Sequence, residues 1–164
     1  MSYEYEVSEV SIFVPAAKVP HMLQSLQSVA KAAIVSDLQS QIKINDLILS
    51  DGRSYASSYV AYLRSGSAHD QDVLDGLHGR ELAPPEILAA LDWKYEFDGT
   101  GNLISMWHQD GSDLHEDEIE SVMPFADLGS YIQVQGDRAD DVFRFVFRSG
   151  QVAKVRATVT FEED

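Results

Sequence analysis

The chain opens with an alternating pattern of apolar and polar residues, YEYEVSEVSIFV. Tyr3, Tyr5 and Val7 share one face, and the apolar residues then cross to the other face at Val10. Alternation with a period of two is typical of a strand that is buried on one side. The change of face predicts a β-bulge or two short strands within residues 3–14.

Apolar residues recur near helical spacing from Val19 to about Leu38, and this predicts the longest amphipathic helix of the chain. The segments IKINDLIL (42–49) and YASSYVAYL (55–63) predict strands, because they are rich in β-branched and aromatic residues around the turn SDGRS. The polar, glycine-punctuated segment 65–80 predicts a long loop with at most one helical turn.

The second half predicts a short helix from Pro84 and a hairpin, KYEFDGTGNLISMWH, over residues 94–108. A helix over residues 112–123 is expected to end at Pro124. The segments GSYIQVQG (129–136), DVFRFVF (141–147) and QVAKVRATVTFEE (151–163) predict three further strands.

Side-chain parity predicts a three-residue loop, 148–150, in the last hairpin, with Phe145 opposite Ala153 and Gly150 in the left-handed conformation. That register places the basic residues of the hairpin on the face opposite the phenylalanines. Because like charges across strands repel, we expect this basic face to meet carboxylates. The residues concerned are Arg144, Arg148, Lys154 and Arg156.

Strands grouped in hairpins with interspersed helices predict the α+β class. We expect a single domain over residues 1–164, with a mainly antiparallel sheet of about six to seven strands and two to three helices. A chain of this length buries most of the surface that it exposes when unfolded.

The amino-acid composition excludes several classes of site and of location. The absence of cysteine excludes disulfides, thiolate nucleophiles and cysteine-based zinc sites. No apolar run approaches the roughly 20 residues of a membrane helix, and the acidic start MSYEYEVSEV is unlike a signal peptide. We therefore expect a soluble cytoplasmic protein that does not enter a membrane.

The chain carries 27 Asp and Glu against 12 Lys and Arg, a formal charge of −15. A chain of this charge repels phosphate backbones and anionic lipids, and it favours partners with basic surfaces. Residues 95–137 hold ten acids and no Lys or Arg, whereas five of the twelve bases lie between Arg138 and Arg156. The charge has an alternative explanation, in which the acidic residues are scattered over the surface and serve only solubility. In that case they would bind no partner.

The stretch HQDGSDLHEDEIE (108–120) concentrates the candidate chemistry. One interpretation is a helix start, with Asp113 as the N-cap and Glu116 completing a capping box. The other is a metal site, for which the sequence offers no His-Glu-x-x-His pattern and no EF-hand loop. A second candidate cluster, HDQDVLDGLH (69–78), is most simply a polar loop. The metal candidates of the two clusters are His69, Asp72, His78, His108 and His115.

Enzymatic signatures are missing from the sequence. The chain has no nucleophile elbow, no phosphate-binding glycine loop and no dinucleotide fingerprint. The patterns therefore favour a non-catalytic protein without a cofactor over an enzyme.

The segments LAALDWKYEFDGTGNLISMWHQDG, VMPFADLGSYIQVQGD and VFRFVFRSGQV resemble a group of small acidic hypothetical proteins of phages and mobile elements. The resemblance covers about residues 88–155. It implies an α+β architecture and an intracellular, phage-linked context, and it assigns no activity and no site residue.

These observations lead to the hypothesis of an acidic protein that binds a basic protein partner, such as a nucleic-acid-binding machine. Its concrete form is a phage-encoded inhibitor of host defence, of the anti-CRISPR or DNA-mimic type, whose carboxylates stand where phosphates normally lie. The expected binding residues are Asp110, Asp113, Glu116, Asp117, Glu120 and Asp127.

Two alternatives stay open at this point. One is a metal- or small-ligand-binding protein, or an enzyme, that uses the clusters at 69–78 and 108–118. The other is a toxin-immunity protein, which would use the same acidic surface against a toxin.

Overall fold

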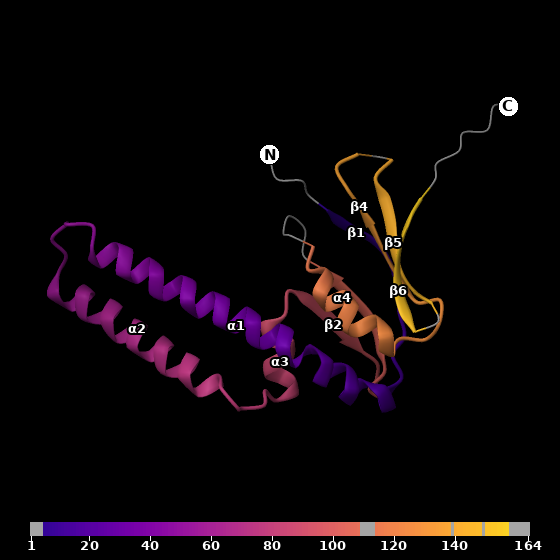
Figure 1. Ribbon diagram of the computed structural model, residues 1–164, viewed down its shortest axis with the longest axis horizontal. Helices are drawn as coiled ribbons and strands as arrows, with labels where there is room; N and C mark the ends of the chain where they lie inside the picture. Colours follow the sequence, from indigo (N-terminus) through magenta and orange to yellow (C-terminus); the bar gives the residue numbers. More distant parts are fainter. Residues whose placement is uncertain (1–4, 109–113, 139, 149, 158–164) are drawn as a thin grey trace. The chain divides into compact units, whose positions relative to one another are not determined.

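The computed structural model describes residues 5–108, 114–138, 140–148 and 150–157, and it shows an α+β protein (Figure 1). The chain divides into two compact units. The sheet unit comprises Met1–Leu26 and Leu91–Asp164, and the helical unit comprises Gln27–Ala90. The α+β class is confirmed, while the expectation of a single domain stays a prediction.

Within the described residues, the sheet unit contains six strands in two antiparallel sheets, where one sheet of six to seven strands was expected, and the chain has four α-helices where two to three were expected. A four-stranded sheet has the order β1-β4-β5-β6, and β2 pairs with β3 in a separate hairpin. The strands are β1 (Glu6–Ser11), β2 (Trp93–Phe97), β3 (Leu103–His108), β4 (Tyr131–Gln135), β5 (Val142–Arg148) and β6 (Gln151–Arg156).

Several local predictions are confirmed in this unit. The register of β1 against β4 shifts between Val7 and Glu9, where the pattern predicted a change of face. The β2–β3 hairpin forms around Asp98, whose Oδ1 accepts hydrogen bonds from the backbone N–H groups of Thr100 (3.0 Å) and Asn102 (2.9 Å). Asp98 thus fixes the turn that joins the two strands.

The predicted register of the last hairpin is wrong. Phe145 pairs with Lys154 rather than with Ala153, and Arg148 pairs with Gln151, so that two residues form the loop. Gly150 does adopt the left-handed conformation, with φ 81°. Lys154 and Arg156 therefore lie on the phenylalanine face and not beside Arg144.

This register is tolerated because a lysine side chain is amphipathic. The Lys154 ammonium lies 4.3 Å from the ring centroid of Phe143 and 5.6 Å from that of Phe145. Its Nζ then reaches Glu116 Oε1 at 3.1 Å. A cation over two aromatic rings replaces the aliphatic contact that simple parity predicted.

The sheet unit has a continuous apolar core. The phenylalanine face of β5 and the inward residues of β4 are buried together with residues of the short helix α4 (Glu116–Val122) and the 3-10 turn η2 (Met123–Phe125). The hairpin adds Trp93, Leu103 and Met106, which are all fully buried. Figure 1 shows α4 lying against the hairpin.

The helical unit departs most from the sequence prediction. Helix α1 (Val19–Leu49) extends well past residue 38, and helix α2 (Ser57–Leu77) replaces both the predicted strand 55–63 and most of the predicted loop 65–80. The predicted strand 42–49 is likewise helical. Helix α3 (Pro84–Ala90) agrees with the prediction, and a 3-10 turn, η1 (Ala16–Lys18), precedes α1.

Helical packing outweighed local strand propensity here. In the helical unit α1 and α2 lie side by side and antiparallel (Figure 1), and Leu63 and Leu77 are buried. Asn45, only 4% exposed, donates from Nδ2 to Ser67 Oγ at 3.0 Å and accepts from Gln41 at 3.0 Å. The Asn45–Ser67 bond joins the two helices and fixes their alignment, while the Gln41 bond lies within α1 and orients the Asn45 amide.

Within the described residues, no helix combines the length and the apolar character that a membrane crossing requires.

Candidate protein-binding surface around helix α4

Helix α4 carries the centre of the acidic stretch. It begins at Glu116, so the N-cap is His115, whose side chain makes no capping hydrogen bond. The first turn contains three acids, Glu116, Asp117 and Glu118, in agreement with the expected preference for carboxylates near a helix N-terminus. The prediction that Asp113 is the N-cap is therefore wrong, and Asp113 and Asp110 both lie outside the described residues.

Glu118 is a buried carboxylate, with only 2% of its surface exposed. One oxygen accepts from the backbone N–H of Asp92 at 2.9 Å. The other accepts from the Tyr95 hydroxyl at 2.7 Å and from the backbone N–H of Trp93 at 3.4 Å. Glu118 therefore ties α4 to the start of β2, and it is a structural group.

Burial changes the acidity of both partners in this contact. Desolvation raises the pKa of Glu118, and the hydrogen bonds from Tyr95, Asp92 and Trp93 oppose that rise. Desolvation also raises the pKa of the Tyr95 hydroxyl, and the Glu118 charge raises it further. Tyr95 is consequently a proton donor to Glu118 and stays protonated.

Two other acids near α4 contact nitrogen atoms of neighbouring side chains. Glu116 accepts from Lys154 at 3.1 Å, which links α4 to β6. Asp92 Oδ2 lies 2.7 Å from His115 Nε2. These contacts hold the N-terminal end of α4 between the hairpin and the sheet.

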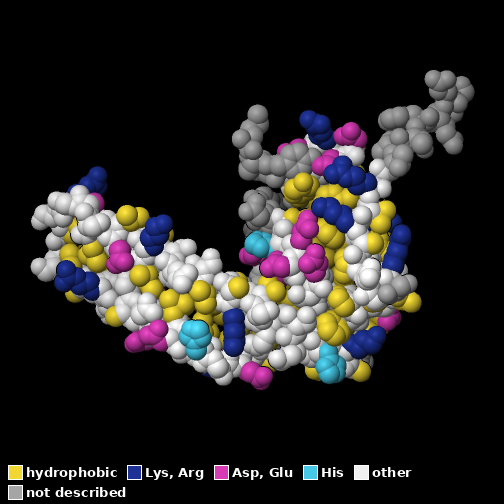
Figure 2. Space-filling model, in the orientation of Figure 1, with side chains coloured by type: hydrophobic (Ala, Val, Ile, Leu, Met, Phe, Trp, Pro, Cys, Tyr) yellow, Lys and Arg dark blue, Asp and Glu magenta, His cyan; other side chains and the backbone are white. Residues whose placement is uncertain are grey.

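The remaining acids of this region face outward. Asp117, Glu120 and Asp127 are exposed, and within the described part of the chain none of them forms an ion pair. Figure 2 shows acidic side chains gathered over α4, beside a histidine. We call Asp117, Glu120 and Asp127 the open carboxylates, because local structure gives their side chains no cationic partner.

Three basic residues of the last hairpin form ion pairs with carboxylates, as expected, but they lie on both faces of the hairpin rather than on one. These residues are Arg144, Lys154 and Arg156. Arg144 Nη2 lies 3.5 Å from Glu9, and its Nε donates to Gln133 Oε1 at 2.8 Å. Arg156 Nη1 lies 3.9 Å from Asp141. Among the described residues, these ion pairs involve three of the seven Lys and Arg of the sheet unit.

The histidine clusters do not form a metal site among the described residues, where no group of three or more His, Cys, Asp or Glu could hold an ion. The structure does bring His108 and His115 together, with ring centroids 5.9 Å apart. His69 and Asp72 are exposed on α2, and His78 is the C-cap residue of that helix.

The charge of the chain is divided unevenly between the two units. The helical unit, residues 27–90, has 8 Asp and Glu against 5 Lys and Arg, a net charge of −3. The sheet unit has 19 acids against 7 bases, a net charge of −12. The acidic character is thus a property of the unit that contains α4.

Fold and surface together define an α+β protein with an acid-rich sheet unit and a helical hairpin. Comparisons with protein-family models, with curated proteins and with solved structures found no match. The resemblance to acidic phage proteins stays a prediction.

Sequence reasoning missed the roles of Glu118 and Tyr95. The available signal was the spacing of Glu118 from Val122, since residues four apart share a helix face and Val122 is on the buried stripe. From the sequence, Glu118 was considered only within the possible metal cluster at 108–118 and was given no structural role.

Proposed function

We propose that the chain is a non-catalytic binding protein that engages a basic protein surface through the open carboxylates at and after helix α4. The observation that carries the proposal is the division of roles on α4. Glu118 and Glu116 are bonded to other elements of the fold, whereas Asp117 and Glu120 are exposed and form no ion pair among the described residues.

The net charge of the sheet unit as a whole supports a basic partner. A net charge of −12 on the sheet unit attracts a positive surface and accelerates encounter. The Glu118 contacts hold the backbone of α4 in place, so little backbone order has to be created on binding.

The finer form of the proposal is that the partner is a nucleic-acid-binding protein of a host defence system, with the carboxylates in the place of phosphates. In that case a duplex oligonucleotide competes with the chain for the same partner surface. Failure of a duplex to compete removes the mimicry and leaves the binding of a basic surface in place.

The test is affinity capture from a cell lysate with three forms of the chain. Asp117→Asn/Glu120→Gln removes two open carboxylates, and Asp37→Asn/Asp72→Asn removes two exposed acids of the helical unit with the same change in net charge. We expect the α4 variant to lose the basic protein that the wild type captures at low salt, and the control to retain it.

Equal capture by all three forms, or equal loss in both variants, contradicts the proposal. The first result means that α4 does not contact the partner. The second means that net charge alone governs capture.

A further inference from the structure

The helical unit is thinly packed for its size. Of its 64 residues, the buried apolar ones are Ala30, Leu63, Leu77, Leu82 and Ile87. Five of the nine exposed large hydrophobic side chains of the described chain belong to the same unit. Most helical stability in proteins comes from packing of an apolar face, so a two-helix hairpin with few buried side chains gains from further packing.

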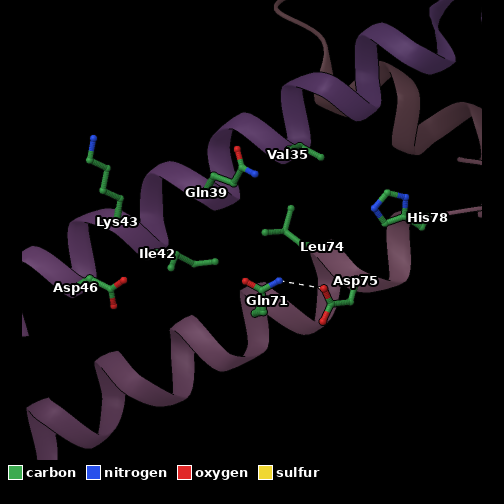
Figure 3. A pocket seen from close by; sticks show the side chains of 9 residues that line it. All are labelled: Val35, Gln39, Ile42, Lys43, Asp46, Gln71, Leu74, Asp75 and His78. Carbon is green, nitrogen blue, oxygen red and sulfur yellow. Dashed lines mark hydrogen bonds between the residues drawn. The ribbon is translucent and has the colours of Figure 1, made fainter.

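An open groove of about 380 Å³ runs between α1 and α2 on one side of this hairpin (Figure 3). Val35 and Ile42 of α1, seven residues apart, and Leu74 of α2 line it and are half-exposed. A seven-residue spacing keeps side chains on one stripe of a helix, which is the geometry of helix–helix seams. The groove therefore fits apolar side chains of a facing helix.

The groove carries a lysine and an aspartate at different levels along its length. The Asn45–Ser67 bond sets the antiparallel alignment, in which Lys43 is level with about residue 69 of α2. Asp75 lies six residues further along α2, about 9 Å from that level at 1.5 Å per residue. His78 lies beyond Asp75.

A second carboxylate of the groove, Asp46, is one turn from Lys43 on α1. Asp75 accepts a hydrogen bond from Gln71 at 3.0 Å and has no cationic partner among the described residues. The groove thus presents Lys43, with Asp46 beside it, toward one end and Asp75 toward the other.

From this arrangement we infer that the groove binds the helical hairpin of a second copy of the chain, in an antiparallel two-fold dimer. A two-fold contact is self-complementary, so Lys43 of each copy meets Asp75 of the other. The floor residues Val35, Ile42 and Leu74 of both copies then pack against each other. The net charge of −3 makes this unit the part of the chain where two copies repel least.

Substitutions that reverse the charge of Lys43 or Asp75 test the dimer. Sedimentation equilibrium of the full chain, at concentrations up to about 0.1 mM, is expected to show a dimer. Lys43→Glu and Asp75→Lys each place two like-charged pairs in the interface, and each is expected to weaken dimerisation about 10-fold to 100-fold. An equimolar mixture of the two variants restores both opposite-charge pairs and forms a heterodimer.

The mixture separates a contact between copies from an effect within one chain, because a chain that is damaged by its own substitution is not repaired by another. Asp37→Lys is the matched control, since it makes the same charge change at an exposed α1 position that does not line the groove. Circular dichroism of each variant checks that the helices remain.

A monomeric wild type over this concentration range overturns the inference. So does a mixture that stays as monomeric as its components, or an Asp37→Lys variant that weakens dimerisation as much as Asp75→Lys. Dimerisation that instead responds to Tyr62→Ser, on an exposed α2 position outside the groove, places the contact on another face and also overturns it.

Discussion

At the scale of single residues, the sheet unit depends on one buried carboxylate. Glu118 accepts three hydrogen bonds from groups at the start of β2. A buried acceptor with several donors is costly to remove, because each donor is then left without a partner. This residue therefore matters to the position of α4 and, through it, to the open carboxylates.

Glu118→Ala is expected to lower the free energy of unfolding by about 2–4 kcal/mol, since it orphans two backbone N–H groups and the Tyr95 hydroxyl. Glu120→Ala, on the exposed side of the same helix, is expected to change it by less than about 0.5 kcal/mol. Urea unfolding of the three proteins measures both values. Equal losses in the two variants would show that the contacts of Glu118 do not hold α4.

Glu118 also has a defined effect on the pH dependence of stability. Burial raises its folded pKa above the ordinary value of 4.5, so the folded state holds the proton more tightly than the unfolded state. Its contribution is complete below the unfolded pKa and is lost as pH rises through the folded pKa. In Glu118→Gln this loss is absent, so the unfolding midpoint should fall less steeply above pH 4.5 than in the wild type. A Glu118→Gln curve that runs parallel to the wild type contradicts this assignment.

At the scale of elements, the turn of the β2–β3 hairpin is held by Asp98. The pKa of this carboxylate is lowered in the folded state, whereas that of Glu118 is raised. The side-chain amide of Asn102, with further help from Thr100, lowers the pKa of Asp98 to about 2. The resulting stability is present above the ordinary value of 3.8 and is lost as pH falls through the folded pKa. Asn102 in turn accepts from the backbone N–H of Ala16 at 2.8 Å, so the turn also anchors the segment before α1.

Asp98→Asn is expected to remove part of the acid lability of the protein. Between about pH 4 and pH 2 the wild type should lose stability more steeply than Asp98→Asn, because only the wild type gains a proton at this turn on unfolding. Asp127→Asn, at an exposed carboxylate, is the control and should follow the wild type. Thermal unfolding at a series of pH values measures all three, and identical acid limbs for wild type and Asp98→Asn would contradict the role of Asp98.

The sequence predicted correctly those elements whose residue pattern is compatible with only one local structure. The bulge after Val7 and the hairpin around Asp98 follow from alternation and turn chemistry, which act over a few residues. The register of the last hairpin was missed because parity treats Lys154 as a polar residue, whereas its stem packs on Phe143 and its charge meets Glu116.

Helix α2 was missed for a different reason. Gly66 and the run of serines around it are weak helix formers, so the local sequence favours a loop. What makes the segment helical is the spacing of Leu63, Ser67, Leu74 and Leu77 against α1. That spacing becomes informative only when the partner helix is known, since the contacts are between residues far apart in the sequence.

At the scale of the whole molecule, the two units differ in charge and in packing. The sheet unit has a continuous core and a net charge of −12, and the helical unit has few buried side chains and a net charge of −3. We therefore propose that the sheet unit binds the basic partner and that the helical unit self-associates. The two proposals are independent, because the variants that test them lie in different units.

The central claim is that the open carboxylates of α4 contact a basic partner, and the salt dependence of binding to the captured protein tests it most directly. The Debye length falls from about 10 Å at 0.1 M salt to about 3 Å at 1 M, so a contact between exposed charges weakens over this range. We expect Asp117→Asn/Glu120→Gln to bind about 3-fold to 30-fold more weakly than wild type at low salt, and the two binding curves to converge at high salt. Curves that coincide at every salt concentration would contradict the claim.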